Sequence, residues 1–202
     1  MGKYDPKDFY YRKAKKAGLR ARSAFKIEEI GERFKLFKPK MAILDLGAAP
    51  GGWLQIMADA CAPGGTVIGV DLVAIPPIAK PGVKTAVLDI LAEDFEAALA
   101  NLHAGKFDLV TSDMAPKTSG IKDSDEARSL ELARLALRTA QRTLKPGGNF
   151  VCKVFMGGDF DAYLLECRKV FETTKIIRPE ATREKSYEHY VVGLALRAEA
   201  AL

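Results

Sequence analysis

The chain has 202 residues, is 48% hydrophobic and 28% charged, and carries a net charge of +5. This composition is typical of a globular protein and argues against a disordered one. No run approaches the roughly 18 apolar residues that a membrane helix needs, and residues 1–6 lack the apolar core of a secretory signal. We therefore expect one cytoplasmic domain over residues 1–202. The three cysteines and two histidines show no metal-ligand spacing, so we expect no metal site.

Positive charge is concentrated near the N-terminus. Residues 1–40 contain 13 Lys/Arg and 5 Asp/Glu, a net of +8, whereas the remainder contains 18 and 21, a net of −3. We expect these forty residues to form a basic, helical extension. Basic side chains that follow aromatic ones (Tyr4, Phe9, Tyr10 and Tyr11) suit a nucleic-acid backbone, and a solvated helix face is the alternative. The candidate RNA-binding residues are Lys13, Lys15, Lys16, Arg20 and Arg22.

A glycine-rich turn follows the first apolar strand. Residues 45–53 read DLGAAPGGW and lead from an apolar run into a helical pattern. Glycine lets the backbone turn tightly and approach a ligand, and the following helix offers free N–H groups to a negatively charged group. The dinucleotide pattern Gly-x-Gly-x-x-Gly cannot be placed on this turn. The segment therefore favours an adenosine cofactor other than NAD and disfavours a Rossmann-type oxidoreductase.

Beyond residue 40, strand and helix patterns alternate. Helical patterns cover residues 54–58, 93–101, 124–143 and 160–171. Strands are expected at residues 43–46, 66–71, 83–88, 107–113, 149–155, 174–177 and 190–196. Such alternation predicts an α/β protein with mainly parallel strands.

Acidic residues lie at or just past several strand ends. They are Asp45, Asp71, Asp89 and Asp113. Ligands of open α/β sheets bind beyond the carboxyl ends of the strands. A single Asp there can be an ordinary helix cap, but four along one edge predict a ligand site.

Several motifs resemble one family in both order and spacing. The matching segments are residues 18–26, 45–53, 112–116, 147–155 and 186–190. The chain resembles the FtsJ/RrmJ ribosomal RNA large-subunit methyltransferases, which are S-adenosylmethionine-dependent 2′-O-ribose methyltransferases. The resemblance implies a Rossmann-like methyltransferase fold, with a seven-stranded, mostly parallel sheet whose last strand is antiparallel and helices on both faces.

The resemblance also implies cofactor-binding residues. Gly51 and Trp53 would lie near the methionine end of S-adenosylmethionine, Asp71 at the ribose, Asp89 at the adenine and Asp113 at the methyl group. Trp53 has a simple alternative as a helix-packing residue. The alternative for Asp89 is a cap on the helix near residue 93.

The implied catalytic residues come from four distant segments: Lys26, Asp113, Lys153 and Glu188. Lys153 lies in the apolar run 150–155, where an isolated charge is costly to bury, so we expect Asp113 and Glu188 as its partners. Lys153 would accept the proton of a ribose 2′-hydroxyl. Burial or a second cation such as Lys26 would favour its neutral form, and the two carboxylates would oppose it. A buried ion pair that fixes the sheet is the structural alternative.

The resemblance implies a specific substrate. It would be a uridine of 23S-type ribosomal RNA, modified in the large ribosomal subunit during ribosome biogenesis. A transfer-RNA methyltransferase and a non-catalytic RNA-binding assembly factor are the alternatives. Lys13 to Arg22 would contact phosphates rather than read bases. No segment indicates a dimer, so a monomer is the default.

Overall fold

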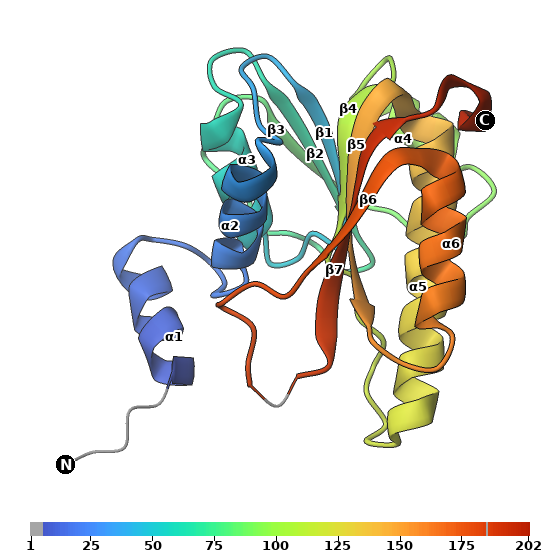
Figure 1. Ribbon diagram of the computed structural model, residues 1–202. Helices are drawn as coiled ribbons and strands as arrows, with labels where there is room; N and C mark the ends of the chain where they lie inside the picture. Colours follow the sequence, from blue (N-terminus) through green and yellow to red (C-terminus); the bar gives the residue numbers. More distant parts are fainter. Residues whose placement is uncertain (1–5, 185) are drawn as a thin grey trace.

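A seven-stranded sheet forms the centre of the computed structural model, which describes residues 6–184 and 186–202 (Figure 1). Tyr4, from the predicted aromatic group, lies outside the described residues. The strand order is β3-β2-β1-β4-β5-β7-β6. The strands are β1 (Ala42–Leu46), β2 (Thr66–Asp71), β3 (Val83–Val87), β4 (Phe107–Ser112), β5 (Leu144–Phe155), β6 (Phe171–Ile177) and β7 (Glu188–Leu196).

The strand directions agree with the predicted fold class. Strands β1 to β5 pair in parallel, whereas β7 is antiparallel to both β5 and β6. In the β5–β7 register, Lys153 lies opposite Tyr190 and Phe155 lies opposite Glu188. The predicted mostly parallel sheet with an antiparallel last strand is confirmed.

Helices cover both faces of the sheet (Figure 1). One face carries α2 and α3, with α1 projecting beyond them, and the other carries α4, α5 and α6. The helices are α1 (Pro6–Lys16), α2 (Ala24–Phe34), α3 (Gly52–Ala60), α4 (Phe95–Leu102), α5 (Lys122–Thr143) and α6 (Phe160–Val170), followed by a short 3-10 helix (Ala198–Ala200). None of the helices in the described ranges is long and apolar enough to cross a membrane.

Two apolar clusters form the core, one on each face. Neighbouring residues of β1 belong to different clusters: Ile43 packs with α2 and α3, and Leu44 packs with α5 and α6. Side chains alternate across a strand, so a central strand covered on both faces is apolar throughout. Burying one such side chain stabilises the fold by about 1.5–3 kcal/mol.

Helix α2 belongs to this packed body, in contrast to the extension expected for residues 1–40. Ile27 and Ile30 are fully buried in the same cluster as α3. A Cβ atom at Gly31 would overlap the ring of Phe37, so the helix packs closely against the following segment. Helix α1 contacts the body through a small cluster that contains Ala14.

The strand boundaries differ most from prediction around β5. The strand begins at Leu144, before the turn expected to precede it, because Leu144 pairs with Phe107. The register then shifts, and Asn149 pairs with Leu109. Strand β7 begins at Glu188, two residues early, because its first residues pair with the end of β5.

Candidate active site

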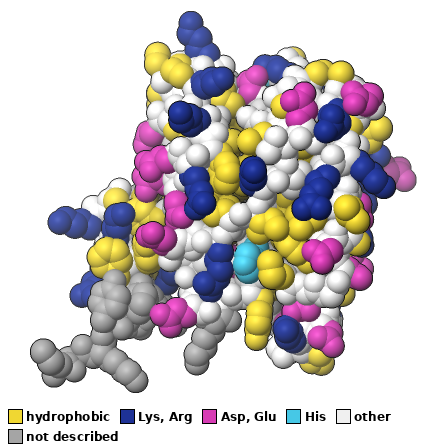
Figure 2. All heavy atoms as spheres, viewed as in Figure 1, with side chains coloured by type: hydrophobic (Ala, Val, Ile, Leu, Met, Phe, Trp, Pro, Cys, Tyr) yellow, Lys and Arg dark blue, Asp and Glu magenta, His cyan; other side chains and the backbone are white. Residues whose placement is uncertain are grey.

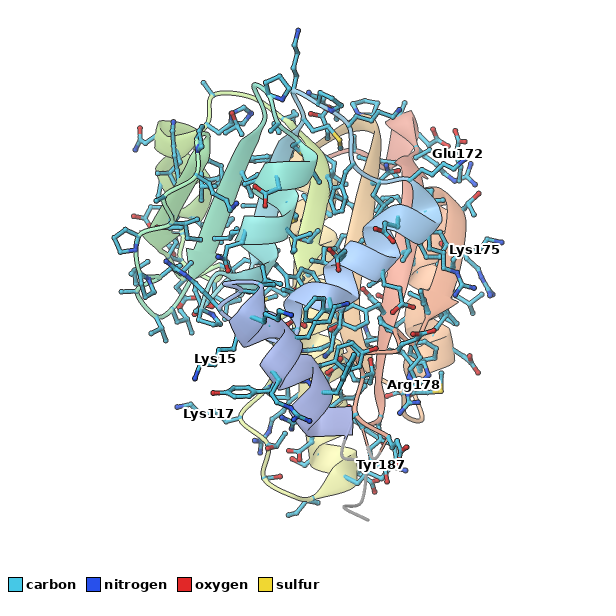
Figure 3. The ribbon with its side chains drawn as sticks, turned by 90° about the vertical axis from the view of Figure 1, so that its left-hand side faces the viewer. Lys15, Lys117, Glu172, Lys175, Arg178 and Tyr187 are labelled. Carbon is cyan, nitrogen blue, oxygen red and sulfur yellow. The ribbon has the colours of Figure 1, made fainter. Side chains whose placement is uncertain are left out.

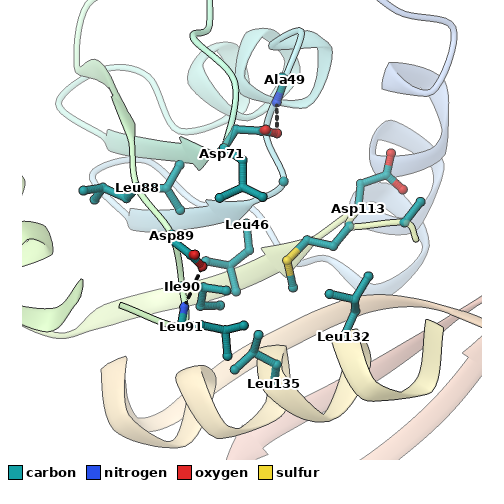
Figure 4. Close-up of a pocket in the computed structure, with 15 residues that line it drawn as sticks. Leu46, Ala49, Asp71, Leu88, Asp89, Ile90, Leu91, Asp113, Leu132 and Leu135 are labelled. Carbon is teal, nitrogen blue, oxygen red and sulfur yellow. Dashed lines mark hydrogen bonds between the residues drawn. The ribbon is translucent and has the colours of Figure 1, made fainter. Parts of the chain in front are cut away.

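A cavity of about 340 Å³ opens beyond the carboxyl ends of the parallel strands (Figure 4). It lies where strand order reverses, since β1 pairs with β2 on one side and with β4 on the other. Open α/β sheets bind ligands at such a point. Three of the four acidic residues at strand ends line the cavity: Asp71, Asp89 and Asp113. On the side of α5, the cavity is lined by Leu132 and Leu135.

Asp71 connects the end of β2 to the glycine-rich turn. Its Oδ2 accepts a hydrogen bond from the backbone N–H of Ala49 at 2.9 Å, and its Oδ1 accepts one from Val73 at 3.0 Å. A carboxylate has about four lone-pair sites, so these two bonds leave acceptor capacity at the cavity. Asp71 therefore both shapes the turn and presents an acceptor to a ligand.

Asp89 does not cap the following helix. Its Oδ1 accepts a hydrogen bond from the backbone N–H of Leu91 at 2.9 Å, and α4 begins only at Phe95. The capping alternative is therefore wrong. Leu72 and Leu91 also line this part of the cavity and are 69% and 72% exposed. A carboxylate beside apolar side chains suits a flat ring that carries polar edge groups.

Gly51 and Trp53 are not among the described residues that line this cavity. Gly51 has φ 101°, and a Cβ atom there would lie 2.8 Å from Ile78 Cδ1. Trp53 is 2% exposed, and its indole N–H donates to the carbonyl of Ser23 at 2.9 Å. Its ring centroid lies 5.8 Å from that of Tyr190. Trp53 therefore packs inside the protein, as expected for a helix-packing residue. A cofactor role for Gly51 and Trp53 stays a prediction.

Lys153 lies beside Asp113 at the end of β4. Its Nζ is 3.1 Å from Asp113 Oδ1 and donates to the Asp113 carbonyl at 2.6 Å. The Lys153 side chain is only 8% exposed. The expected pairing of Lys153 with Asp113 is confirmed, and it explains how an amine is accommodated in an apolar strand.

Glu188 forms an ion pair with Lys26 of α2, whereas we expected it to pair with Lys153. The strand register explains the difference, because Glu188 lies opposite Phe155 and two residues beyond Lys153. Its carboxylate reaches α2 instead. The structure therefore brings the four predicted catalytic residues into two ion pairs, but Glu188 pairs with Lys26 and not with Lys153. Because Lys26 is neutralised by Glu188, it is not the uncompensated second cation considered for Lys153.

Tyr190 links the two carboxylates and was not predicted as a site residue. Its hydroxyl lies 2.8 Å from Asp113 Oδ1 and 3.0 Å from Glu188 Oε1, and its one proton donates to either. Burial, reinforced by both carboxylates, raises the pKa of Tyr190 well above its usual value. Tyr190 therefore remains a donor. The signal was the Glu-x-Tyr spacing, which places both side chains on one face of a strand.

Asp45 is the fourth strand-end acid and is buried in β1. Its Oδ1 accepts the hydroxyl of Thr111 at 2.7 Å, and Oδ2 has no hydrogen-bond partner within the described part of the chain. Burial raises the pKa of the Asp45 carboxyl well above its usual value; the Thr111 hydrogen bond opposes this, and Asp113 and Asp71 add to it. Asp45 therefore contributes to the fold through Thr111 rather than as a surface ligand.

Replacing Asp45 with asparagine should stabilise the protein at high pH. The pKa of Asp45 is about 3.9 in the unfolded chain and is raised in the folded protein. At pH values between the two, the native state binds more protons than the unfolded state. The stability of the wild-type protein therefore falls as pH rises through this range. One pKa unit corresponds to about 1.4 kcal/mol, so we expect Asp45→Asn to raise the free energy of unfolding by at least ~1 kcal/mol near pH ~8 and hardly at all near pH ~4. Urea denaturation at both values checks this. Asp59→Asn, at an exposed carboxylate, is the control, and an equal gain at both pH values would contradict the assignment.

The predicted RNA-binding residues fall into two groups. Lys13, Lys15 and Lys16 are exposed near the end of α1, where dark-blue side chains surround the helix at the lower left of Figure 2. Arg20 instead donates to the carbonyls of Pro50 at 3.1 Å and Pro76 at 2.5 Å, and also to that of Pro77. Its guanidinium group therefore holds two loops together rather than extending toward solvent.

Arg22 also contacts the body of the protein. Its Nη2 donates to the carbonyl of Ala181 at 2.7 Å, and its guanidinium carbon lies 5.7 Å from the centroid of the Tyr10 ring. These contacts fix the segment between α1 and α2 against the loop that precedes β7. Arg22 also lines one cavity together with Lys26 and Glu188.

The chain matches known proteins over almost its whole length. The family model described as FtsJ-like methyltransferase matches residues 19–196. Ribosomal RNA large subunit methyltransferase E of Myxococcus xanthus is 61% identical over 199 residues, which cover 98% of this chain and 93% of that protein. The protein of the same name from Anaeromyxobacter sp. is 59% identical over 98% of this chain and 72% of its own length.

Solved structures share the fold. A Plasmodium falciparum protein assigned as a ribosomal RNA methyltransferase matches with a TM-score of 0.77 at 23% identity, over 88% of this chain and 98% of that one. A Streptococcus mutans protein assigned as a methyltransferase and solved in complex with SAH matches with a TM-score of 0.52 at 10% identity, over 80% of this chain and 90% of that one. The family match and the high identities confirm the resemblance drawn from the sequence. The chain belongs to the FtsJ-like methyltransferase family.

Proposed function

We propose that this protein transfers a methyl group from S-adenosylmethionine to the 2′-oxygen of a uridine in large-subunit ribosomal RNA. The observation that carries the proposal is the buried Lys153–Asp113 pair at the edge of the cavity, joined through Tyr190 to Glu188 and Lys26. The relatives named ribosomal RNA large subunit methyltransferase E support the choice of RNA. Action on the ribosome favours a cytoplasmic location.

The cavity fits the proposed cofactor. Asp71 would accept hydrogen bonds from the ribose hydroxyls, and Asp89 with Leu72 and Leu91 would hold the adenine. Gly51 in the glycine-rich turn would face the methionine end, and Trp53 would pack behind that turn. When bound, the cofactor supplies a sulfonium methyl group as the electrophile.

Lys153 would act as the proton acceptor. The reacting form would be the neutral amine, which has two N–H bonds and one lone pair; the two contacts of Nζ with Asp113 would take up both N–H bonds. Its lone pair then points away from Asp113 and can accept the proton of the ribose hydroxyl. Asp113 fixes the direction of the amine, and Tyr190 holds the Asp113 carboxylate in place. Positioning of the hydroxyl beside the methyl group would supply much of the rate.

Methyl transfer to isolated RNA substrates tests the proposal. Labelled S-adenosylmethionine would be offered with large ribosomal subunits and with transfer RNA, both from cells that lack this protein. We expect label on the large subunit, at a uridine whose ribose resists alkaline cleavage. Label on transfer RNA alone would favour the transfer-RNA alternative, and RNA binding without transfer would favour an assembly factor. Label on a base would contradict the assigned chemistry.

The lysines of α1 should contribute affinity for RNA but none for the cofactor. Replacing Lys13, Lys15 and Lys16 together with glutamine should weaken RNA binding, and the salt dependence should become less steep by about 0.7–0.9 for each phosphate that is no longer neutralised. Binding measured over a range of KCl concentrations checks the slope. The matched triple variant at Lys35, Lys38 and Lys40, which are exposed between the end of α2 and the start of β1, should change little. Equal loss of cofactor and RNA binding would point to misfolding.

A further inference from the structure

The linker between α1 and α2, residues 17–23, is fixed to the helix that follows the glycine-rich turn. The side-chain amide of Gln55 on α3 donates to the carbonyl of Gly18 at 3.0 Å and accepts the backbone N–H of Arg20 at 2.9 Å. Figure 3 shows this side of the molecule, with α1, α2 and α3 facing the viewer. The two hydrogen bonds hold the backbone of the linker beside α3.

From this linker, the side chain of Arg20 reaches two loops. It donates to the carbonyl of Pro50 in the glycine-rich turn at 3.1 Å. It also donates to the carbonyls of Pro76, at 2.5 Å, and Pro77 in the loop between β2 and β3. Lys15 on α1, by contrast, points away from the body of the protein in Figure 3. The guanidinium group of Arg20 therefore bridges two loops of the protein itself.

Both of these loops contribute to the wall of the cofactor cavity. Ala49, directly before Pro50, lines the cavity, and so does Leu72 at the start of the β2–β3 loop. Asp71 joins the same two loops at a second point, because its carboxylate accepts the backbone N–H groups of Ala49 and Val73. The cavity wall is therefore held by a carboxylate that faces the cavity and by a guanidinium group from the linker.

We propose that Arg20 is a positioning residue for the cofactor, which holds the glycine-rich turn and the β2–β3 loop in the geometry that S-adenosylmethionine needs. The inference rests on the proposed function. Arg20 is not among the described residues that line the cavity, so it acts on the cofactor through the two loops. Loops that are already held in place lose less conformational entropy when a ligand binds, which raises the affinity. This role replaces the phosphate contact predicted for Arg20 from the sequence.

Replacing Arg20 with glutamine tests the inference by calorimetry with S-adenosylmethionine. Hydrogen bonds from a charged group are strong enough that the dissociation constant should rise by about 10-fold. In methyl transfer to large ribosomal subunits, the KM for S-adenosylmethionine should rise, whereas kcat at saturating cofactor and the KM for the subunit should stay close to wild type. Arg20→Lys keeps the charge but lacks the guanidinium fork that spans both loops, so it should restore only part of the affinity.

The matched control is a second cation that binds backbone oxygens away from the cavity. Lys106, directly before β4, donates to the backbone oxygens of Arg142 and Leu202. Lys106→Gln removes a comparable bridge and should leave the affinity for S-adenosylmethionine unchanged. Urea denaturation without cofactor checks that each variant is folded. Should Arg20→Gln not fold, Arg20→Lys carries the test.

The outcomes separate this inference from the alternatives. Wild-type cofactor affinity in Arg20→Gln would overturn it, and a rise in the KM for the subunit alone would return Arg20 to the RNA-binding residues. Full wild-type affinity in Arg20→Lys would also overturn it, because the positive charge rather than the bridge would then be what matters. If the wild-type protein itself binds no S-adenosylmethionine, the proposed function fails instead.

Discussion

Replacing Lys153 with alanine should abolish methyl transfer and leave the affinity for S-adenosylmethionine close to that of wild type. The amine is the only part of Lys153 that can accept a proton, and a positioned general base typically contributes a factor of about 10²–10⁴. Lys153 does not line the cofactor cavity as described, whereas Asp113, its partner, does. Single-turnover transfer with labelled cofactor measures the loss, and calorimetry measures cofactor binding.

The control for this substitution lies on the same strand. Lys145, near the start of β5, pairs with Asp108 at 2.7 Å and is largely exposed. Lys145→Ala should leave transfer unchanged, which separates loss of a base from loss of a lysine on β5. Lys153→Met keeps most of the apolar volume and should be as inactive as alanine. Full turnover by either variant would contradict the assignment of Lys153 as the proton acceptor.

Replacing Asp71 with alanine should weaken S-adenosylmethionine binding by about 100-fold or more. The change removes the acceptor proposed for the ribose hydroxyls and leaves the backbone N–H groups of Ala49 and Val73 without their partner. Hydrogen bonds to a charged group contribute about 1.5–3 kcal/mol each, and the glycine-rich turn loses its link to β2. Titration calorimetry with S-adenosylmethionine measures the affinity directly.

Asparagine at this position separates the two contributions. Asp71→Asn keeps one acceptor oxygen, so it should retain one of the two backbone hydrogen bonds and bind the cofactor with intermediate affinity. Asp59→Ala removes a carboxylate from the exposed surface of α3, where it pairs with Lys80, and should bind normally. Unchanged affinity in Asp71→Ala would remove Asp71 from the cofactor site.

The sheet was largely predictable because its strands are apolar runs that end at turn residues. Strand β2 matches its predicted range, and β4 differs from it by one residue. The exceptions depend on partners that sequence patterns do not reveal. Leu144 joins β5 only because Phe107 lies opposite it, and α2 joins the core only because its buried face meets α3.

The contacts among the predicted site residues were only partly predictable from the sequence. Lys153 and Asp113 were expected as partners and are, because a buried amine needs a carboxylate. The pairing of Glu188 with Lys26 depends on a crossing between β7 and α2, and no local pattern encodes that crossing. Arg20 was predicted to contact RNA phosphates, and the sequence could not show that three carbonyls converge on its side chain.

The antiparallel register of β5 and β7 has a consequence for how this protein can change in length. Glu188 and Tyr190 face the same side only because one residue separates them, and Tyr190 lies opposite Lys153. Inserting a single residue between them would turn one side chain to the other face of the sheet and break the link between Asp113 and Glu188. An insertion at the exposed residues 158–159, just before α6, would by contrast leave that pairing frame intact. Insertions and deletions within residues 188–190 should therefore damage the site far more than conservative substitutions there.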